Sequence, residues 1–354
     1  MNPATHGSIC ETLVAMIVSH AAAAGATAVP VAPVAMGWGD VLSQQLITGV
    51  SNGMIIALIA IGYTMVYGII ELINFAHGDL CTLGSILALT LVGALGMEAW
   101  SGMGGTAAVI TLLISAAIFC GALNWTIDRV AYRPLRGKPK LALLVSAIGC
   151  SFILVNIALF WGGLPMEVFG GGNQAAAPKD FPSLISNENL LGAQSAITVT
   201  WRDLFVVIVT VPLMIGLTWL VKSTRLGKAM RAVAQNPTAA ALMGIDVNRV
   251  IGSTFLIGGA LGGFASVIYA LYNNTISFQM GYRTGMDAFT AAVLGGIGSL
   301  PGAVVGGIVI GLVRALSDGY IEARWTNSVV FGILILTLVF RPSGILGAKL
   351  REKV

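Results

Sequence analysis

Long apolar segments, separated by short polar ones, cover most of the 354-residue chain. In segments such as MIIALIAIGYTMVYGII (54–70) the apolar residues run without interruption, whereas the strands of a membrane barrel alternate apolar and polar residues. A helix needs about 20 such residues to cross a bilayer. The pattern therefore predicts an all-α integral membrane protein, a polytopic bundle of about 8–10 transmembrane helices. The expected spans are 46–70, 78–97, 105–128, 141–161, 204–221, 250–272, 286–299, 301–317 and 327–341.

Broken or short helices are expected in two places. The stretch ELINFAHGD (71–79) places Glu71, His77 and Asp79 within otherwise apolar chain, where burying an ionisable group is costly. It joins two spans, and counting spans back from the basic zone at 129–140 places it on or near the cytoplasmic side, where its charges need not cross the hydrocarbon. The stretch at 293–307, VLGGIGSLPGAVVGG, combines glycines with a proline. It predicts two short helices or a re-entrant pair broken at Pro301, with the backbone lining a cavity.

Glycines four residues apart recur in the apolar segments, as in Gly259 with Gly263 and Gly307 with Gly311. In lipid, helices gain little hydrophobic stabilisation against each other, and close backbone approach at small residues replaces it. These pairs predict tight helix–helix contacts.

Composition supports lipid as the solvent of this chain. Hydrophobic residues make up 56% and charged residues 10%, against about 25% charged residues in ordinary soluble domains. The four cysteines are far apart and form no CxxC, and the three histidines lack ligand spacing, so no disulfide or metal site is expected. The chain contains no GxxxxGK[ST] loop, so no cofactor is expected in it and any ATP would be bound by a partner.

Basic residues predict the orientation of the spans. No Lys or Arg precedes Arg129, and the basic residues then gather at 129–140, at 222–249 and at the C-terminus. By the positive-inside rule these three zones, including the C-terminus, are cytoplasmic. The long segment 162–203 then lies on the outer side.

Residues 1–39 form an apolar, alanine-rich extension without the basic start of a signal peptide. Two possibilities stay open for it: an extra transmembrane helix, or a loosely structured addition. Residues 40–354 form the remaining domain.

The cytoplasmic segment 222–249 contains a short helix with clear ends. Asn236 is a good N-cap and Pro237 a good first residue, and Gly244 suits the C-cap position. A basic helix is expected upstream, between Lys222 and Gln235. A small capped helix suits insertion into a groove of another protein, although a surface loop with fortuitous capping would look similar.

Several blocks, in this order, resemble the permease subunits of bacterial ATP-binding-cassette importers for branched-chain amino acids, specifically the H-type subunit. The blocks are ALIAIGYTMVYGIIELINFAHGD (57–79), RVAYRPLR (129–136), RAVAQNPTAAALMGI (231–245), AFTAAVLGGIGSLPGAVVGG (288–307) and RPSGILG (341–347). The resemblance covers roughly residues 40–354. It implies a non-catalytic subunit of the inner membrane that pairs with a second permease, two cytoplasmic ATPases and a periplasmic binding protein.

The resemblance also implies a role for the short cytoplasmic helix, and the two broken stretches supply candidates for the substrate path. The ATPase-coupling helix would consist of Asn236, Pro237, Thr238, Ala239, Ala240, Ala241, Leu242, Met243 and Gly244. Candidates for the translocation path or gate are Asn74, His77, Asp79, Gly295, Gly296 and Ser299. The alternative is that these six residues only fix helix breaks or lie at the cytoplasmic boundary.

Other functions remain open from the sequence. Permeases of the same family for urea, short amides or other amino acids share much of this pattern. A stand-alone secondary transporter or channel would often carry paired charges within the membrane, and here Asp287 and Arg314 are the main isolated ones. A purely structural membrane subunit is disfavoured by the broken helices.

Overall fold

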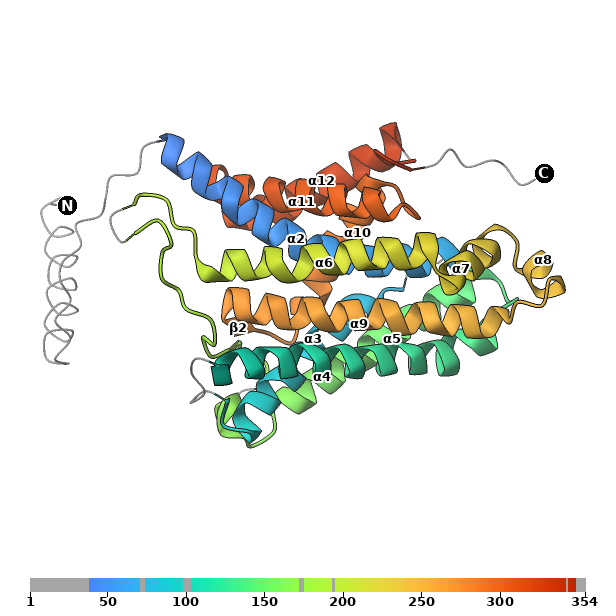
Figure 1. Cartoon of the computed structure of the whole chain (residues 1–354), viewed down its shortest axis with the longest axis horizontal. Helices are drawn as coiled ribbons and strands as arrows, with labels where there is room; N and C mark the ends of the chain where they lie inside the picture. The colour runs from blue at the N-terminus through green and yellow to red at the C-terminus, as the bar shows by residue number, and fades with distance from the viewer. Residues whose placement is uncertain are drawn as a thin grey trace, which may run out of the picture. The chain divides into compact units, whose positions relative to one another are not determined.

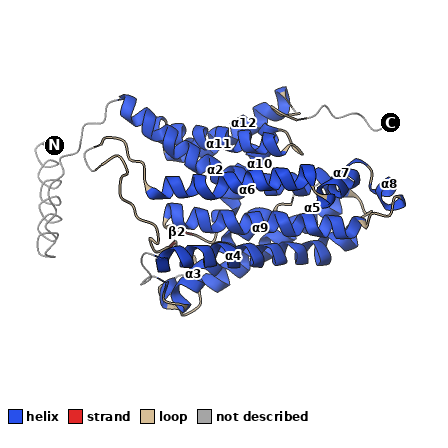
Figure 2. Ribbon diagram, in the orientation of Figure 1, coloured by secondary structure: helices blue, strands red, loops and turns tan. Residues whose placement is uncertain are grey.

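Helices account for most of the chain between Trp38 and Phe340 (Figures 1 and 2). The computed structural model describes residues 38–70, 74–97, 103–171, 175–192, 195–341 and 343–347. Within them, eight helices are long and apolar enough to cross a membrane, which confirms the predicted all-α polytopic bundle. The helices are α2 (Trp38–Ile70), α3 (Ala76–Ala94), α4 (Met103–Ile127), α5 (Lys140–Gly162), α6 (Trp201–Ser223), α7 (Arg225–Gln235), α8 (Pro237–Leu242), α9 (Val247–Asn273), α10 (Met280–Gly295), α11 (Leu300–Tyr320) and α12 (Ala323–Phe340).

Short elements complete the chain. A π turn (Asp128–Tyr132) and a 3₁₀ turn (Arg133–Leu135) extend α4, and a further 3₁₀ turn covers Glu167–Phe169. Strands β1 (Lys179–Asp180) and β2 (Thr275–Ile276) pair antiparallel, with Lys179 opposite Ile276. This pairing ties the long connection before α6 to the end of α9. The expectation for residues 1–39 lies outside the described residues, except that Trp38 and Gly39 begin α2.

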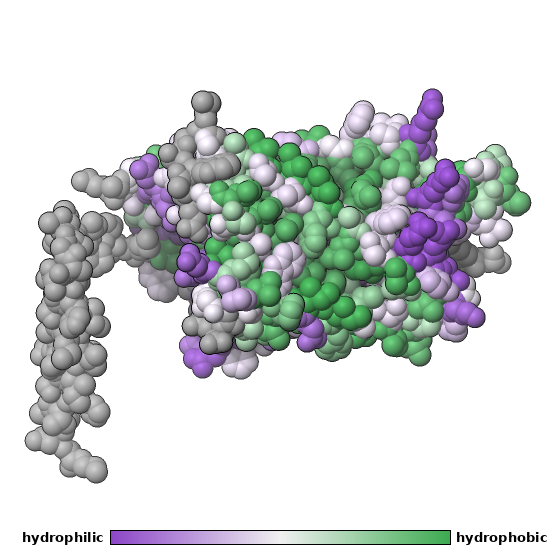
Figure 3. Space-filling view, turned by 90° about the horizontal axis from the view of Figure 1, so that it is seen from below, coloured by the Kyte–Doolittle hydropathy of each residue, from purple (hydrophilic) through white to green (hydrophobic). Residues whose placement is uncertain are grey.

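The bundle has a buried centre and an exposed apolar exterior. Helices α2, α3 and α9 are largely buried, whereas only about a fifth of the membrane-spanning residues of α5, α6 and α12 is buried, and each of these three helices exposes several large apolar side chains. Figure 3 shows an apolar belt between two ends at which hydrophilic side chains gather. An exposed apolar belt is what a protein solvated by lipid requires.

Glycines bring α2 and α11 into backbone contact. A Cβ built on Gly53 would lie 2.8 Å from the Cα of Ile308, and one on Gly49 would lie 2.9 Å from the Cα of Leu312. From the other side, Gly311 packs directly against the backbone of Gly53. The order of these contacts makes the two helices antiparallel. Gly259 and Gly263 do the same between α9 and α4, so the predicted glycine packing is confirmed.

The break near 293–307 differs from the expectation. Helix α10 ends at Gly295 and α11 begins at Leu300, so the break lies before Pro301, which occupies the first turn of α11. Proline is favourable there because the first turn has no partner for its N–H. Helix α11 is 21 residues long and is a candidate span. The expectation of two short helices was therefore wrong for α11, and only α10 is short.

We expect Gly311→Leu to destabilise the bundle, because the new side chain would overlap the backbone of α2 at Gly53. Overpacking of this kind costs about 1–3 kcal/mol, so the melting temperature of the protein in lipid nanodiscs should fall. The matched control is Gly216→Leu on α6, where an added Cβ meets nothing within 4 Å. Equal melting temperatures for the two variants would contradict the packing role of Gly311.

Candidate functional site

The first turn of α3 lies inside the bundle. The side chain of His77 packs against Gly62 of α2, eight residues before that helix ends at Ile70, which is about 12 Å along the helix axis. Asn74, His77 and Asp79 are 3%, 0% and 2% exposed. The expectation that the charges of this stretch avoid burial is therefore wrong for His77 and Asp79. Glu71 lies outside the described residues.

His77 occupies space that Gly62 leaves open. A Cβ on Gly62 would lie 2.8 Å from Cε1 of the imidazole, so no larger residue fits beside it. The ring meets Tyr63 edge-on, with 4.8 Å between ring centroids. Neither ring nitrogen makes a hydrogen bond of good geometry within the described residues. Buried polar atoms are normally satisfied, which marks this imidazole as a functional candidate.

Asp79 connects α3 to α5. Its Oδ2 accepts a hydrogen bond from Ser151, while Oδ1 has no partner among the described residues. Ser151 and Tyr63, which contact Asp79 and His77, also line a cavity of about 420 Å³. The other lining residues are mainly apolar: Phe75, Ile148, Phe152, Val155, Gln279, Gly281, Tyr282, Gly285 and Met286.

The N-terminus of α10 meets that of α3 beside this cavity. Gly78 packs against Gly281 and Gly285, whose Cα would lie 2.9 Å from a Cβ on Gly78. The N–H of Gly281 donates to Thr82 Oγ1 at 2.8 Å. Two helix N-termini carry partial positive charge, so this part of the bundle favours an anionic group.

Asn74 belongs to a buried polar network that the sequence did not reveal. Its amide donates to Asn124 Oδ1 at 3.2 Å, and its Oδ1 accepts from the Tyr132 hydroxyl at 2.9 Å. Asn124 in turn donates to the carbonyl of Phe255 at 2.6 Å. Tyr132 reaches inward from the π turn that ends α4, and such turns are frequent at functional sites. An Asn within the apolar run of α4 was the available sequence signal.

Gly295, Gly296 and Ser299 lie at the other end of α10, about 15 Å or more from Gly281 and Gly285 along the helix. Gly296 has a φ of +106°, and Ser299 caps α11 by accepting from the N–H of Gly302 at 3.2 Å. The structure does not bring these residues together with Asn74, His77 and Asp79. Their role in the path stays a prediction.

The C-terminal segment covers the end of α10. The N–H groups of Ile345 and Leu346 donate to the carbonyls of Leu294 and Gly295 at 2.8 and 2.9 Å. Carbonyls in the last turn of a helix have no partner within the helix. The segment after α12 supplies these partners, which gives the RPSGILG block a structural reason.

Helix α8 forms a small capped projection at one end of the bundle (Figure 1). The Asn236 side chain accepts from the N–H of Ala239 at 3.0 Å, and Gly244 has a φ of +83°. Ala240 is buried, whereas Leu242 and Met243 are 84% and 83% exposed. The exposed apolar surface is thus larger than the alanines alone would give.

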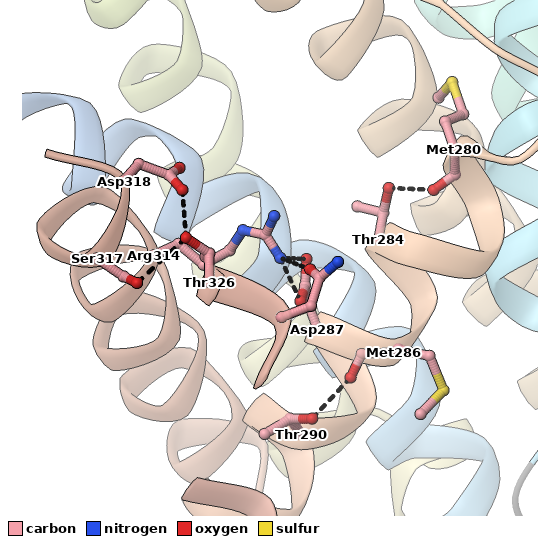
Figure 4. A network of polar contacts seen from close by, with 10 residues as sticks. Met280, Thr284, Met286, Asp287, Thr290, Arg314, Ser317, Asp318 and Thr326 are labelled. Carbon is pink, nitrogen blue, oxygen red and sulfur yellow. Dashed lines mark hydrogen bonds and ion pairs between the residues drawn. The ribbon is translucent and has the colours of Figure 1, made fainter. Parts of the chain in front are cut away.

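Asp287 and Arg314 were isolated charges in the sequence, but the structure pairs them. One guanidinium nitrogen of Arg314 lies 2.7 Å from each carboxylate oxygen of Asp287 (Figure 4). Asn327 of α12 also accepts from Arg314, at 3.4 Å. The pair joins α10 to α11 next to a solvent-accessible cavity.

Helices that begin inside a transmembrane bundle, as α3 and α10 do, are typical of the substrate paths of membrane transport proteins. A family model for the permease component of branched-chain amino acid transport systems matches residues 45–339. The chain belongs to this family.

Similar proteins agree with this assignment. The permease protein LivH of the high-affinity branched-chain amino acid transport system of Escherichia coli K12 is 40% identical over 316 residues, which cover 88% of this chain and 97% of that protein. The corresponding protein BraD of Pseudomonas aeruginosa is 39% identical with the same coverage. The fructose import permease FruG of Bifidobacterium longum is 25% identical over 73% of this chain and 72% of its own length. No solved structure matches.

We expect Asn124→Ala to destabilise the protein by about 1–3 kcal/mol, because it leaves the buried amide of Asn74 without this partner. The melting temperature in nanodiscs measures the loss. Tyr132→Phe, which removes one hydrogen bond and keeps the ring, is the milder comparison and should cost less. An Asn124→Ala variant as stable as the wild type would contradict the network's structural role.

Proposed function

We propose that this chain is the non-catalytic permease subunit of an ATP-driven importer that takes up leucine, isoleucine and valine across the bacterial inner membrane. Membership of the family and 40% identity to LivH support the substrate class. The observation that carries the ATP-driven part is α8, a projecting capped helix in a chain without an ATP-binding loop. Energy then has to come from a partner.

Helix α8 is the coupling helix in this proposal. Leu242 and Met243 would enter a groove of a cytoplasmic ATPase, while Ala240 holds the helix on the bundle. Helix α7 supports it, since its N-cap Thr224 accepts from the N–H of Gly227 and its Met230 and Val233 are buried. A helix anchored in this way transmits a rigid-body movement into α6 and α9.

The complete transporter would contain a second related permease, two ATPases that bind ATP and magnesium, and a periplasmic binding protein. A probable branched-chain amino acid permease named LivM, from Methanocaldococcus jannaschii, is 29% identical over 36% of this chain, which supports a paralogous partner. The exposed apolar faces of α5, α6 and α12 are available to that subunit or to lipid. The basic segments and the C-terminus would face the cytoplasm.

Substrate would pass the cavity beside the starts of α3 and α10. The two helix N-termini favour its carboxylate, and the apolar lining suits a branched aliphatic side chain. Movement between outward-open and inward-open states requires each partner to bind the two states unequally. His77 and Asp79, buried where the starts of α3 and α10 meet, would form part of the gate.

The family's fold does not by itself fix the substrate. FruG is a fructose permease at 25% identity, so urea, short amides or other amino acids are tested alongside leucine, isoleucine and valine. Uptake of these labelled compounds by the co-expressed complex decides between them. Uptake without ATPase subunits would support a stand-alone transporter instead.

We expect the double substitution Leu242→Ser with Met243→Ser to abolish co-purification of the ATPase subunits while the permease stays in the membrane. The reason is the loss of the exposed apolar surface of α8. The matched control is Leu190→Ser with Leu191→Ser, which removes exposed apolar side chains from the connection before α6. Unchanged co-purification of the ATPase subunits with the α8 variant would contradict the assignment of α8 as the coupling helix.

We expect Asp79→Asn to reduce ATP-driven leucine uptake in proteoliposomes, because it removes a buried carboxylate whose Oδ1 has no partner among the described residues. The amide keeps the size of the side chain and can still accept from Ser151. ATPase co-purification checks assembly of the variant. Uptake at the wild-type rate would reduce Asp79 to a structural link between α3 and α5.

A further inference from the structure

Helices α2, α9, α10 and α11 enclose a polar cavity of about 260 Å³ at the end of the bundle opposite α8. Helix α9 begins shortly after α8, and its last residue, Asn273, lines the cavity. The 27 residues of α9 separate the two ends by about 39 Å at 1.5 Å per residue. With α8 on the cytoplasmic side, the cavity lies toward the outer side.

The Asp287–Arg314 pair, drawn in Figure 4, lines this cavity. Both carboxylate oxygens are 2.7 Å from Arg314, and the two side chains are 9% and 19% exposed. The pair neutralises itself, so neither charge is free to attract a ligand strongly. It is a neutral, polar part of the cavity wall and links α10 to α11.

Two charged side chains without an ion-pair partner among the described residues lie one helical turn from the Asp287–Arg314 pair. Arg283 precedes Asp287 by one turn on α10, and Asp318 follows Arg314 by one turn on α11. Because α10 and α11 run antiparallel, both steps lead toward the same end of the bundle. Both side chains line the cavity, and no ion pair joins them in the part of the chain that the structure describes.

Other polar groups of the cavity are also available. Arg283, Gln45 and Asn52 all line the cavity, and no side-chain hydrogen bond engages any of them within the described residues. The Asp318 carboxylate accepts from Thr326, which holds it in place and leaves it able to accept further bonds. The Arg283 guanidinium and the Asp318 carboxylate, beside the neutral Asp287–Arg314 pair, match the carboxylate and the ammonium group of an α-amino acid.

A second hollow of about 260 Å³ shares Arg283 and Asp287 with this cavity. Its further lining includes apolar side chains: Met280, Met286, Val330 and Phe331. Methionine adapts to differently shaped aliphatic groups. This hollow can therefore accept the side chains of leucine, isoleucine and valine while their charged ends stay between Arg283 and Asp318.

We propose that this cavity is an amino-acid binding site within the permease, in which Arg283 holds the α-carboxylate and Asp318 the α-ammonium group. The site rests on the proposed function and adds to it a place on the outer side where the amino acid binds first. It also continues inward, because the second hollow shares Tyr282 and Met286 with the cavity beside the starts of α3 and α10.

The test measures binding of labelled leucine to the purified complex in nanodiscs, without the periplasmic binding protein. We expect saturable binding that leucinamide, which lacks the carboxylate, displaces poorly. Arg283→Gln should weaken leucine binding about tenfold or more and lose the preference for leucine over leucinamide. Asp318→Asn should likewise lose the preference for leucine over 4-methylpentanoate, which lacks the ammonium group.

Arg324→Gln is the matched control, because Arg324 is an exposed arginine at the start of α12, paired with Glu322 and outside the cavity. It should bind leucine as the wild type does. The proposal is overturned if Arg283→Gln and Arg324→Gln behave alike, or if the wild-type complex imports leucine but shows no saturable binding of its own. A wild-type complex that imports no leucine in the full transport assay would instead refute the proposed function.

Discussion

The hydrocarbon of a membrane offers no hydrogen bonds, so every polar group that the bundle buries has to find its partner within the protein. This constraint is most demanding where α3 and α10 begin inside the bundle. The first turn of α10 gives the N–H of Gly281 to Thr82 of α3, and the last carbonyls of α10 receive the N–H groups of Ile345 and Leu346. Helix α10 can therefore be short and internal only because α3 and the C-terminal segment satisfy its two ends.

Close glycine packing makes those partnerships possible. Gly78, Gly281 and Gly285 let the starts of α3 and α10 touch, and Gly62 leaves room for His77. Any Cβ at these positions would separate the helices and leave polar groups unsatisfied. Close packing of Gly302 against Gly295 and of Gly306 against Ala291 likewise brings α11 against α10, which carry Arg314 and Asp287. Close helix packing and the hydrogen bonding of buried polar groups therefore depend on each other in this bundle.

The features linked to transport are distributed over the length of the bundle. The capped helix α8 lies at one end, the buried His77 and Asp79 lie between, and the cavity with Arg283 and Asp318 lies at the other end. Helices α6 and α9 run the distance between the ends. In the proposed mechanism, a movement imposed at α8 reaches the outer cavity through these continuous helices, and the arrangement changes where α3 and α10 begin inside the bundle.

Periodicity and composition alone determined the class of the fold, because apolar runs of about 20 residues in a chain this poor in charge can only be lipid-spanning helices. Local chemistry also determined α8, since Asn236, Pro237 and Gly244 specify its ends without help from distant residues. What depends on contacts across the chain could not be read in this way. Asn124 and Tyr132 join Asn74 from positions far along the sequence, and Asp287 and Arg314 stand 27 residues apart until α10 and α11 fold against each other. The burial of His77 and Asp79 was likewise decided by the tertiary structure, because only the packing of α3 against Gly62 of α2 draws that polar stretch into the bundle.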